Sequence, residues 1–143
     1  MKKKAFILML ILAVFSTMVL TACGGSKTLE QYVAEDTEMQ ESIDAAMESS
    51  NVLVTVKENE VTYTYDLSKM EGYTEEVVKD EEVLASLDST LTSAGPTFGG
   101  ISKTLEERTK IKGITTTVVY TWEDEVLITK SFSSADAVED AAE

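Results

Sequence analysis

The chain has 143 residues, with 12 Lys and Arg against 26 Asp and Glu, no histidine and one cysteine, and its net charge is −14. Binding to DNA or RNA needs a basic surface that displaces counterions from phosphates, so this composition excludes a nucleic-acid partner. Without histidine the chain lacks the commonest general base and the commonest transition-metal ligand, and a single cysteine cannot form an internal disulfide.

The N-terminal segment, residues 1–22, has the pattern of a signal peptide. Three lysines at residues 2–4 precede an uncharged, mostly apolar run from Ala5 to Leu20. The length of this run suits a signal peptide and is slightly short for a membrane-spanning helix, which needs about 20 residues. The tetrad Leu-Thr-Ala-Cys that ends at Cys23 resembles the bacterial lipobox, in which the cysteine sulfur receives a diacylglyceryl group and the chain is cut just before that cysteine.

We therefore expect a mature chain that starts at Cys23, is anchored through its acyl chains at the outer face of the cell membrane, and has a short tether at residues 23–27. Two acyl chains give stable anchoring, whereas one gives marginal binding. Loss of residues 1–22 removes three lysines and no acidic residue, so the net charge changes from −14 to −17. Anionic lipids repel such a domain, which predicts that it does not adhere to the bilayer. The alternative is a plain secreted protein, cut at the same small residues, with a free thiol at Cys23.

The domain is predicted to begin with a helical region. Thr28 with Gln31 forms a capping-box pattern, and a helical repeat of apolar residues continues to Met47. Asp36-Thr37 interrupts this repeat and could cap a second segment, so the region is one helix or two. We expect it to end at Asn51, because asparagine adopts the left-handed conformation that closes helices.

Residues 52–65 predict a β-hairpin, because Val and Tyr alternate with polar residues on both sides of a two-residue loop at Glu58-Asn59. This loop puts six apolar residues on one face, and burial of that face normally sets the register. The expected pairs are Val56 with Val61, Val54 with Tyr63, and Val52 with Tyr65.

One or two helices follow the first hairpin. We expect a helix from about Thr74 to Thr92, a break at residues 93–96, and a second helix with Pro96 in its first turn. Gly99 and Gly100 weaken the second helix, and Gly113 is expected to close it as Asn51 closes the first region. The buried stripes are predicted at Val77, Leu84, Leu87 and Leu91, and then at Phe98, Ile101 and Leu105.

Residues 114–132 predict a second hairpin, in which the loop length decides the pairing. A two-residue loop at Glu123-Asp124 would set Val126 opposite Thr121 and split the apolar set. A three-residue loop that ends at Glu125 keeps the apolar set together, and we expect this loop. The pairs that it makes are Val126 with Trp122 and Ile128 with Tyr120.

Together these elements predict an α+β fold: a four-stranded antiparallel sheet, made of two β-hairpins, with two to four helices packed on one face, in the order α-ββ-α(α)-ββ. We expect one domain at residues 28–132. Residues 133–143 are small and acidic and lack aromatics, which predicts a disordered tail. Each half contains a helix and a hairpin with a similar Glu-Asn-Glu-Val or Glu-Asp-Glu-Val turn, which indicates either a faint duplication or two hairpins with the same turn chemistry.

Three stretches carry a family resemblance: Cys-Gly-Gly-Ser-Lys-Thr-Leu-Glu-Gln-Tyr, the Val-rich hairpin with Tyr-Thr-Tyr, and Leu-Glu-Glu-Arg-Thr-Lys-Ile-Lys-Gly-Ile-Thr followed by Val-Val-Tyr. They resemble small lipoproteins of Gram-positive gut bacteria that are grouped under an uncharacterised domain of unknown function, over Thr28 to about Phe132. Similar proteins tend to have a regular helix before Leu-Glu-Glu, where this chain has glycine or proline at 95–96 and 99–100. The resemblance implies no activity and no catalytic residues.

Motifs for catalysis, metals and cofactors do not emerge from the chain. Gly-x-Ser-x-Gly is absent, and residues 95–100 have the glycines of a phosphate loop, but Ile101 stands where that motif requires Lys and no strand leads into it. The acidic runs at 35–38 and 80–82 lack the EF-hand pattern and suit solvated helix faces. We therefore expect no enzymatic activity, no metal site and no cofactor.

The aromatic residues of the strands, Tyr63, Tyr65, Tyr120 and Trp122, have two interpretations. They share faces with Val and Ile, which favours a place in the core. Alternatively they form a platform that stacks on sugars or peptides. We expect a non-catalytic binding or interaction module with an unidentified protein or cell-wall partner. The alternative function is an accessory lipoprotein that captures a small ligand or cell-wall fragment for an enzyme or transporter.

Overall fold

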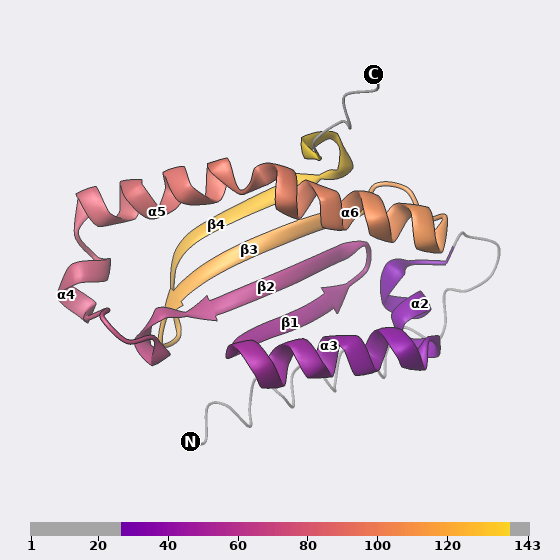
Figure 1. Ribbon diagram of the computed structural model, residues 1–143, viewed down its shortest axis with the longest axis horizontal. Helices are drawn as coiled ribbons and strands as arrows, with labels where there is room; N and C mark the ends of the chain where they lie inside the picture. Colours follow the sequence, from indigo (N-terminus) through magenta and orange to yellow (C-terminus); the bar gives the residue numbers. More distant parts are fainter. Residues whose placement is uncertain (1–26, 138–143) are drawn as a thin grey trace.

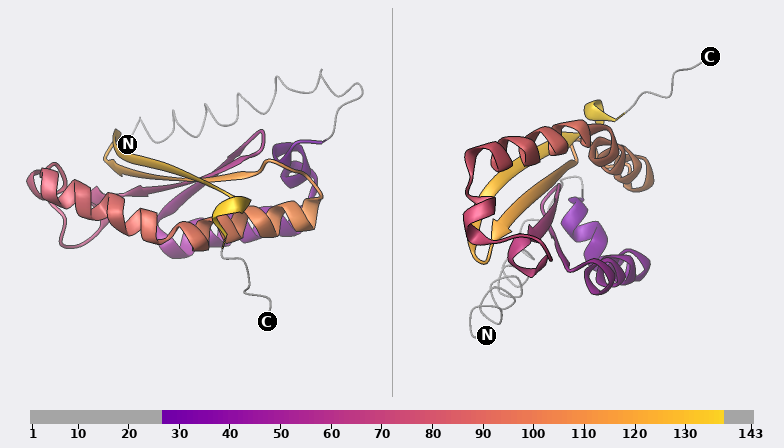
Figure 2. Two further views of the ribbon diagram at one scale, coloured as in Figure 1. Left: turned by 90° about the horizontal axis from the view of Figure 1, so that it is seen from above. Right: turned by 60° about the vertical axis from the view of Figure 1, so that its left-hand side comes forward.

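The computed structural model describes residues 27–137. In this range four strands form one sheet in the order β1-β2-β3-β4, and the helices lie on one face of it (Figures 1 and 2). The predicted α+β class, element order and one-sided helical layer are confirmed. The predicted signal peptide, Cys23 and residues 138–143 lie outside the described residues. The strands are β1 (Val52–Lys57), β2 (Glu60–Asp66), β3 (Thr115–Trp122) and β4 (Glu125–Ser133).

The sheet is mixed, so the prediction of a purely antiparallel sheet is wrong. β1 pairs with β2 and β3 with β4 in antiparallel hairpins, but β2 and β3 are parallel, from Glu60 opposite Thr115 to Asp66 opposite Thr121. The reason is the long helical connection between the hairpins, which carries the chain back to the end of the sheet where β2 starts. As a result the two hairpin turns lie at opposite ends of the sheet (Figure 1).

The N-terminal region forms two helices, α2 (Leu29–Glu35) and α3 (Thr37–Ser50). Asp36 separates them: its backbone is extended, and its side chain accepts a hydrogen bond from the backbone N–H of Met39 as the N-cap of α3. The capping box of Thr28 and Gln31 is confirmed at the start of α2. Asn51 closes α3 in the left-handed conformation, as predicted.

The first hairpin has the predicted loop and register. Its pairs include Val56 with Val61, Val54 with Tyr63, and Val52 with Tyr65. Val52, Val54 and Val61 are buried, which confirms that burial of this face accompanies the register.

The single helix predicted at residues 74–92 is wrong, because Asp80 divides it. A 3₁₀ helix, η1 (Leu67–Lys69), precedes α4 (Glu75–Val78), and α5 (Glu81–Ser93) follows. Asp80 has an extended backbone, and its side chain accepts from the N–H groups of Glu82 and Val83, so it starts a new helix. The buried position of α4 is accordingly Val78 and not Val77, which is 41% exposed.

Helix α6 (Gly95–Thr109) has Pro96 in its first turn, as predicted, and continues through Gly99 and Gly100. Its buried stripe is not the predicted Phe98, Ile101 and Leu105, which are half-buried. It consists of small and polar residues: Gly95, Gly99, Ser102 and Glu106. Gly99 is required there because a Cβ atom would lie 2.4 Å from the backbone nitrogen of Ala137.

Two boundaries near α6 and β4 also differ from expectation. Lys110, and not Gly113, closes α6 with a left-handed backbone; Gly113 is left-handed too, but lies further along the chain. Ser133 ends β4 and caps a 3₁₀ helix, η2 (Ser134–Asp136), so residues 133–136 are folded and do not start a disordered tail. The close approach of this segment to Gly99 explains why it is ordered.

The second hairpin has the two-residue loop, so the predicted three-residue loop is wrong. Trp122 pairs with Glu125 and Thr121 with Val126, and a bulge next to Thr121 then restores the predicted pairing of Tyr120 with Ile128. The extra residue that keeps the apolar set together is therefore placed inside β4 and not in the loop. Val126 is 60% exposed in consequence.

The core has two clusters of buried side chains. The first is aliphatic and lies among α2, α3, the first hairpin and the start of β3; it contains Leu29, Val33, Met39, Val52, Val54, Val61, Ile111 and Ile114. The second is smaller and has partly buried aromatic neighbours; it contains Leu91, Val118 and Phe132.

Candidate functional site

Three of the four predicted aromatic residues gather on the helix-covered face of the sheet. Helix α3 packs on β1, whereas α5 and α6 pack on β4, so β2 lies between the two groups of helices (Figure 1). Tyr63 and Tyr65 come from β2, and Tyr120 lies directly opposite Tyr65 on β3. All three are half-buried and pack against the core clusters. We call this set the tyrosine row.

The rings of the tyrosine row pack against each other and against α6. The centroids of Tyr65 and Tyr120 are 5.7 Å apart in an edge-to-face arrangement. Tyr63 lies 6.2 Å from Phe98 of α6, and Phe98 stacks on Phe132 of β4 at 5.5 Å. Such contacts fix ring positions and add stability beyond area burial. The ring bodies therefore belong to the edge of the core.

The hydroxyl groups of the tyrosine row are not used by the fold. These hydroxyls form no hydrogen bond with residues 27–137. Every fully buried side-chain N or O atom in that range has a hydrogen-bond partner, so hydroxyls without a partner there must be accessible to solvent. Burial raises the pKa of Tyr63, Tyr65 and Tyr120 above the usual 10.0, which keeps all three protonated at neutral pH. The row can thus donate and accept hydrogen bonds while its rings supply apolar contact.

Trp122 does not join the tyrosine row. It pairs with Glu125 beside the turn of the second hairpin and is half-buried. Among the described residues it belongs to neither core cluster and has no ring contact within the observed aromatic pairs. The structure therefore packs the rings of the three tyrosines against the core, and among the described residues no ring contact joins Trp122 to them.

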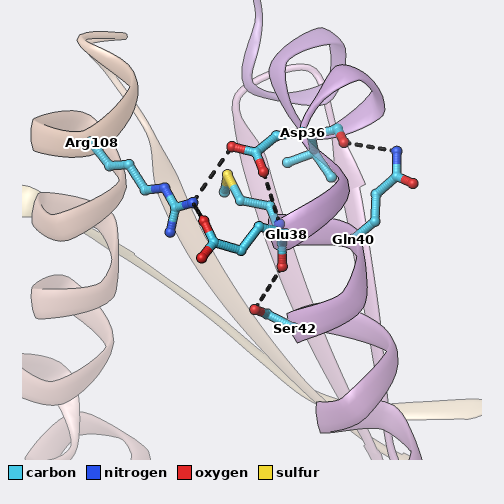
Figure 3. Close-up of polar contacts among 7 residues, drawn as sticks. Asp36, Glu38, Gln40, Ser42 and Arg108 are labelled. Carbon is cyan, nitrogen blue, oxygen red and sulfur yellow. Dashed lines mark hydrogen bonds and ion pairs between the residues drawn. The ribbon is translucent and has the colours of Figure 1, made fainter.

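Arg108 of α6 joins the two groups of helices. This residue, the only arginine of the chain, places a guanidinium nitrogen 2.8 Å from Glu38 Oε2 and 3.5 Å from Asp36 Oδ2, across from α6 to the junction of α2 and α3 (Figure 3). The hydrogen bond with Glu38 raises the pKa of Arg108 further, so the charge is permanent. A lone arginine in an acidic chain was the available sequence signal for this contact.

A buried hydroxyl pair, which the sequence did not reveal, fixes α6 on the sheet. Ser102 Oγ lies 2.8 Å from Thr116 Oγ1 and donates to the carbonyl of Phe132 at 3.2 Å, and both Ser102 and Thr116 are fully buried. Because these polar atoms satisfy each other, the pair stabilises one position of α6 and has no spare donor for a ligand.

Two kinds of feature, a metal-binding cluster and a membrane-spanning helix, are absent from residues 27–137. In this range no group of three or more Asp, Glu, Cys or His side chains is placed to hold a metal ion. None of the helices described there is long and apolar enough to cross a membrane.

The chain belongs to the family described as domain of unknown function DUF4854, whose sequence profile matches residues 29–132. The match spans α2 to the end of the core in β4, so it contains the tyrosine row and Arg108. No curated protein and no solved structure matches the chain.

Proposed function

We propose that this protein is an extracytoplasmic lipoprotein of a Gram-positive bacterium, acylated at Cys23 and held at the outer face of the cell membrane, whose domain is a non-catalytic binding module. The observation that carries the proposal is the only cysteine of the chain, in Leu-Thr-Ala-Cys, directly after a positive segment and the apolar run from Ala5 to Leu20. This context suits lipid attachment, and two acyl chains give stable anchoring.

The binding role is supported by the tyrosine row. Tyrosine is enriched at protein interfaces because its ring supplies apolar contact and its hydroxyl a hydrogen bond at low entropic cost. Here the rings are already fixed by packing and the hydroxyls are unused within the described residues. The proposed partner is therefore a protein or a cell-wall polymer with both polar and apolar groups.

The anchor is tested with Cys23→Ala in intact cells of a Gram-positive host. The unchanged protein should incorporate labelled fatty acid and partition into the detergent phase. The variant should lose the label and either leave the membrane or accumulate as the uncut precursor. A correctly cut variant that still partitions into detergent would contradict acylation at Cys23.

The binding surface is tested by photo-crosslinking from the same cells. A photoreactive amino acid at Tyr120 should capture a discrete partner, and a matched probe at Thr129, which is exposed and alternates to the other face of β4, should not. Equal yields of the same product from both positions would argue against the tyrosine row as the binding surface.

A further inference from the structure

A basic pocket lies at the end of the sheet where the chain enters the domain. It has a volume of about 410 Å³ and is lined by Lys27, Asn59, Thr109, Lys110, Ile111 and Lys112. Three lysines and no acidic residue form this lining, although the whole chain has 26 acidic and 12 basic residues. A local excess of positive charge against this background needs an explanation.

One wall of the pocket is the loop after α6, which is held in a fixed shape. The carboxylate of Glu106 accepts hydrogen bonds from the backbone N–H groups of Gly113 at 2.9 Å and Ile114 at 3.1 Å. Ile111 and Ile114 are buried in the first core cluster, whereas Lys110 and Lys112 are exposed. The loop therefore presents two lysines on a base that is held in place by Oε1 of Glu106.

The turn of the first hairpin also lines the pocket, through Asn59. The Asn59 side-chain oxygen accepts from the N–H of Leu29 at 2.9 Å, and its carbonyl accepts from the N–H of Thr115 at 3.0 Å. Its side-chain nitrogen makes no hydrogen bond with residues 27–137, so a donor is left at the pocket wall.

The three lysines of the pocket differ in whether an acidic residue pairs with them. Lys27 forms an ion pair with Glu35. Neither Lys110 nor Lys112 has an ion pair within the described part of the chain. Lys110 caps the C-terminus of α6, where a cation offsets the helix dipole. That effect is confined to the last turn, so it does not account for Lys112 or for Lys27.

We propose that this pocket binds the phosphate group of a phosphate ester, either an anionic phospholipid or a soluble phosphorylated molecule. Lysine ammonium groups bind phosphate as point charges, and the side-chain amide of Asn59 adds a directed donor. The pocket volume is within the range for small ligands and leaves space for the alcohol portion of the ester. The lysines recognise the charge, and Asn59 orients the group.

The position of Lys27 puts lipid headgroups within reach. Only a short segment, Gly24 to Lys27, follows Cys23, and an extended chain of that length spans roughly 14 Å at about 3.5 Å per residue. The phospholipid source rests on the proposed anchor at Cys23, whereas the soluble source does not. Failure of the phosphate site would leave the Cys23 labelling result unchanged, so the two proposals fail separately.

The test is an NMR titration of ¹⁵N-labelled residues 23–143 carrying Cys23→Ser. All buried residues of both core clusters lie within 29–132, so this chain retains the whole core. Glycerol 1-phosphate should produce saturable shifts of the amides of Asn59 and of residues 110–113, and glycerol should not. Lys110→Gln with Lys112→Gln should weaken binding by about tenfold or more. Lys112→Gln alone should weaken it partly.

The matched control is Lys69→Gln with Lys103→Gln, which removes the same charge outside the pocket and should leave the affinity unchanged. Shifts that never saturate, or an equal loss of affinity in both double variants, would overturn the site.

Vesicle binding then identifies the source of the phosphate. Binding to phosphatidylglycerol vesicles but not to phosphatidylcholine vesicles, with competition by glycerol 1-phosphate, indicates a phospholipid. Binding of glycerol 1-phosphate alone indicates a soluble ester, and binding of neither overturns the proposal.

Discussion

The two ends of the sheet use the same turn in different surroundings (Figure 1). In both hairpins the first loop residue is a glutamate with a left-handed backbone, Glu58 with φ of 52° and Glu123 with φ of 54°. In both, a carboxylate from another segment accepts the N–H of that glutamate: Glu30 at 2.8 Å in the first turn and Asp66 at 3.0 Å in the second. The carboxylate holds a conformation that glycine adopts more easily.

What differs is the packing around each turn. At the first turn Glu30 is 7% exposed and also donates its own N–H to the Glu58 carbonyl, and the neighbouring Leu29 is fully buried. At the second turn Val126 is 60% exposed, and the neighbouring Glu125 makes an ion pair with Lys79 at the surface. The turn sequence thus sets the local geometry, and the segment that binds the turn sets how much the turn contributes to stability.

The largest effect is expected from Leu29→Ala, at the first turn. Leu29 has no exposed surface and belongs to the aliphatic cluster, so truncation leaves a cavity and should cost about 2–5 kcal/mol of unfolding free energy. Urea unfolding followed by circular dichroism measures this loss, with the exposed Val77→Ala as the control. A loss under about 1 kcal/mol would mean that this end is not the better packed one.

Glu30→Ala should have the next largest effect. It removes the carboxylate that accepts the Glu58 N–H in a partly buried hydrogen bond, and a hydrogen bond to a carboxylate contributes about 1.5–3 kcal/mol. Glu30→Gln keeps a side-chain oxygen in place and should recover most of the loss in the same urea experiment. Equal losses in both variants would show that charge, and not the hydrogen bond to the turn, is what matters.

Asp66→Asn tests the second turn through pH. Burial acts to raise the pKa of Asp66, but hydrogen bonds from Ser68 and Glu123 and the charge of Lys69 outweigh it and lower the pKa below 3.8. A lowered folded-state pKa stabilises the protein above the unfolded value, and this contribution disappears as the pH falls through the folded value. The variant should be about 1 kcal/mol less stable at pH 7, and the difference should shrink as the pH falls below 3.8 and disappear once the pH is below the lowered folded-state pKa.

Urea midpoints of both proteins from pH 7 to pH 2 measure this dependence. A difference that stays constant over the whole range would show that the ionised carboxylate does not hold the second turn.

Local rules were sufficient for the parts of the fold that depend on neighbours in sequence. The capping box at Thr28, the left-handed Asn51 and the register of the first hairpin each follow from a few adjacent residues, and each was predicted correctly. The parallel pairing of β2 and β3 depends instead on a helical connection whose path is set by packing. The small and polar stripe of α6 was missed for a related reason, because Gly99 and Ser102 are selected by close approach of η2 and β3 and not by hydrophobicity.

The candidate sites likewise combine features that neighbouring residues predict with contacts between segments that are distant in sequence. The tyrosines of the first hairpin were predicted to share a face, but the contact of Tyr65 with Tyr120 arises from the parallel pairing, which the sequence did not predict. The lysine pocket joins residues from the domain start, the first turn and the loop after α6. Lys27 precedes α2, whereas Lys110 and Lys112 follow α6, so no short motif in the sequence could reveal the pocket.

The smallest effect is expected at the second turn, from Val126→Ala. Val126 was predicted to face Trp122 within the apolar set, but the two-residue loop pairs it with Thr121, and the bulge that follows leaves it 60% exposed. Truncation of a side chain in water removes little burial, so the unfolding free energy should change by no more than about 0.5 kcal/mol. The matched substitution is Val61→Ala beside the first turn, where valine is 5% exposed and the loss should be about 1.5–3 kcal/mol. The two valines would then differ in energy because Val61 lies with Tyr63 on the helix-covered face of the sheet, whereas Val126, paired with Thr121, lies on the opposite face. Losses of equal size in urea would contradict that difference, and they would place Val126 in a packed environment that the two-residue loop does not provide.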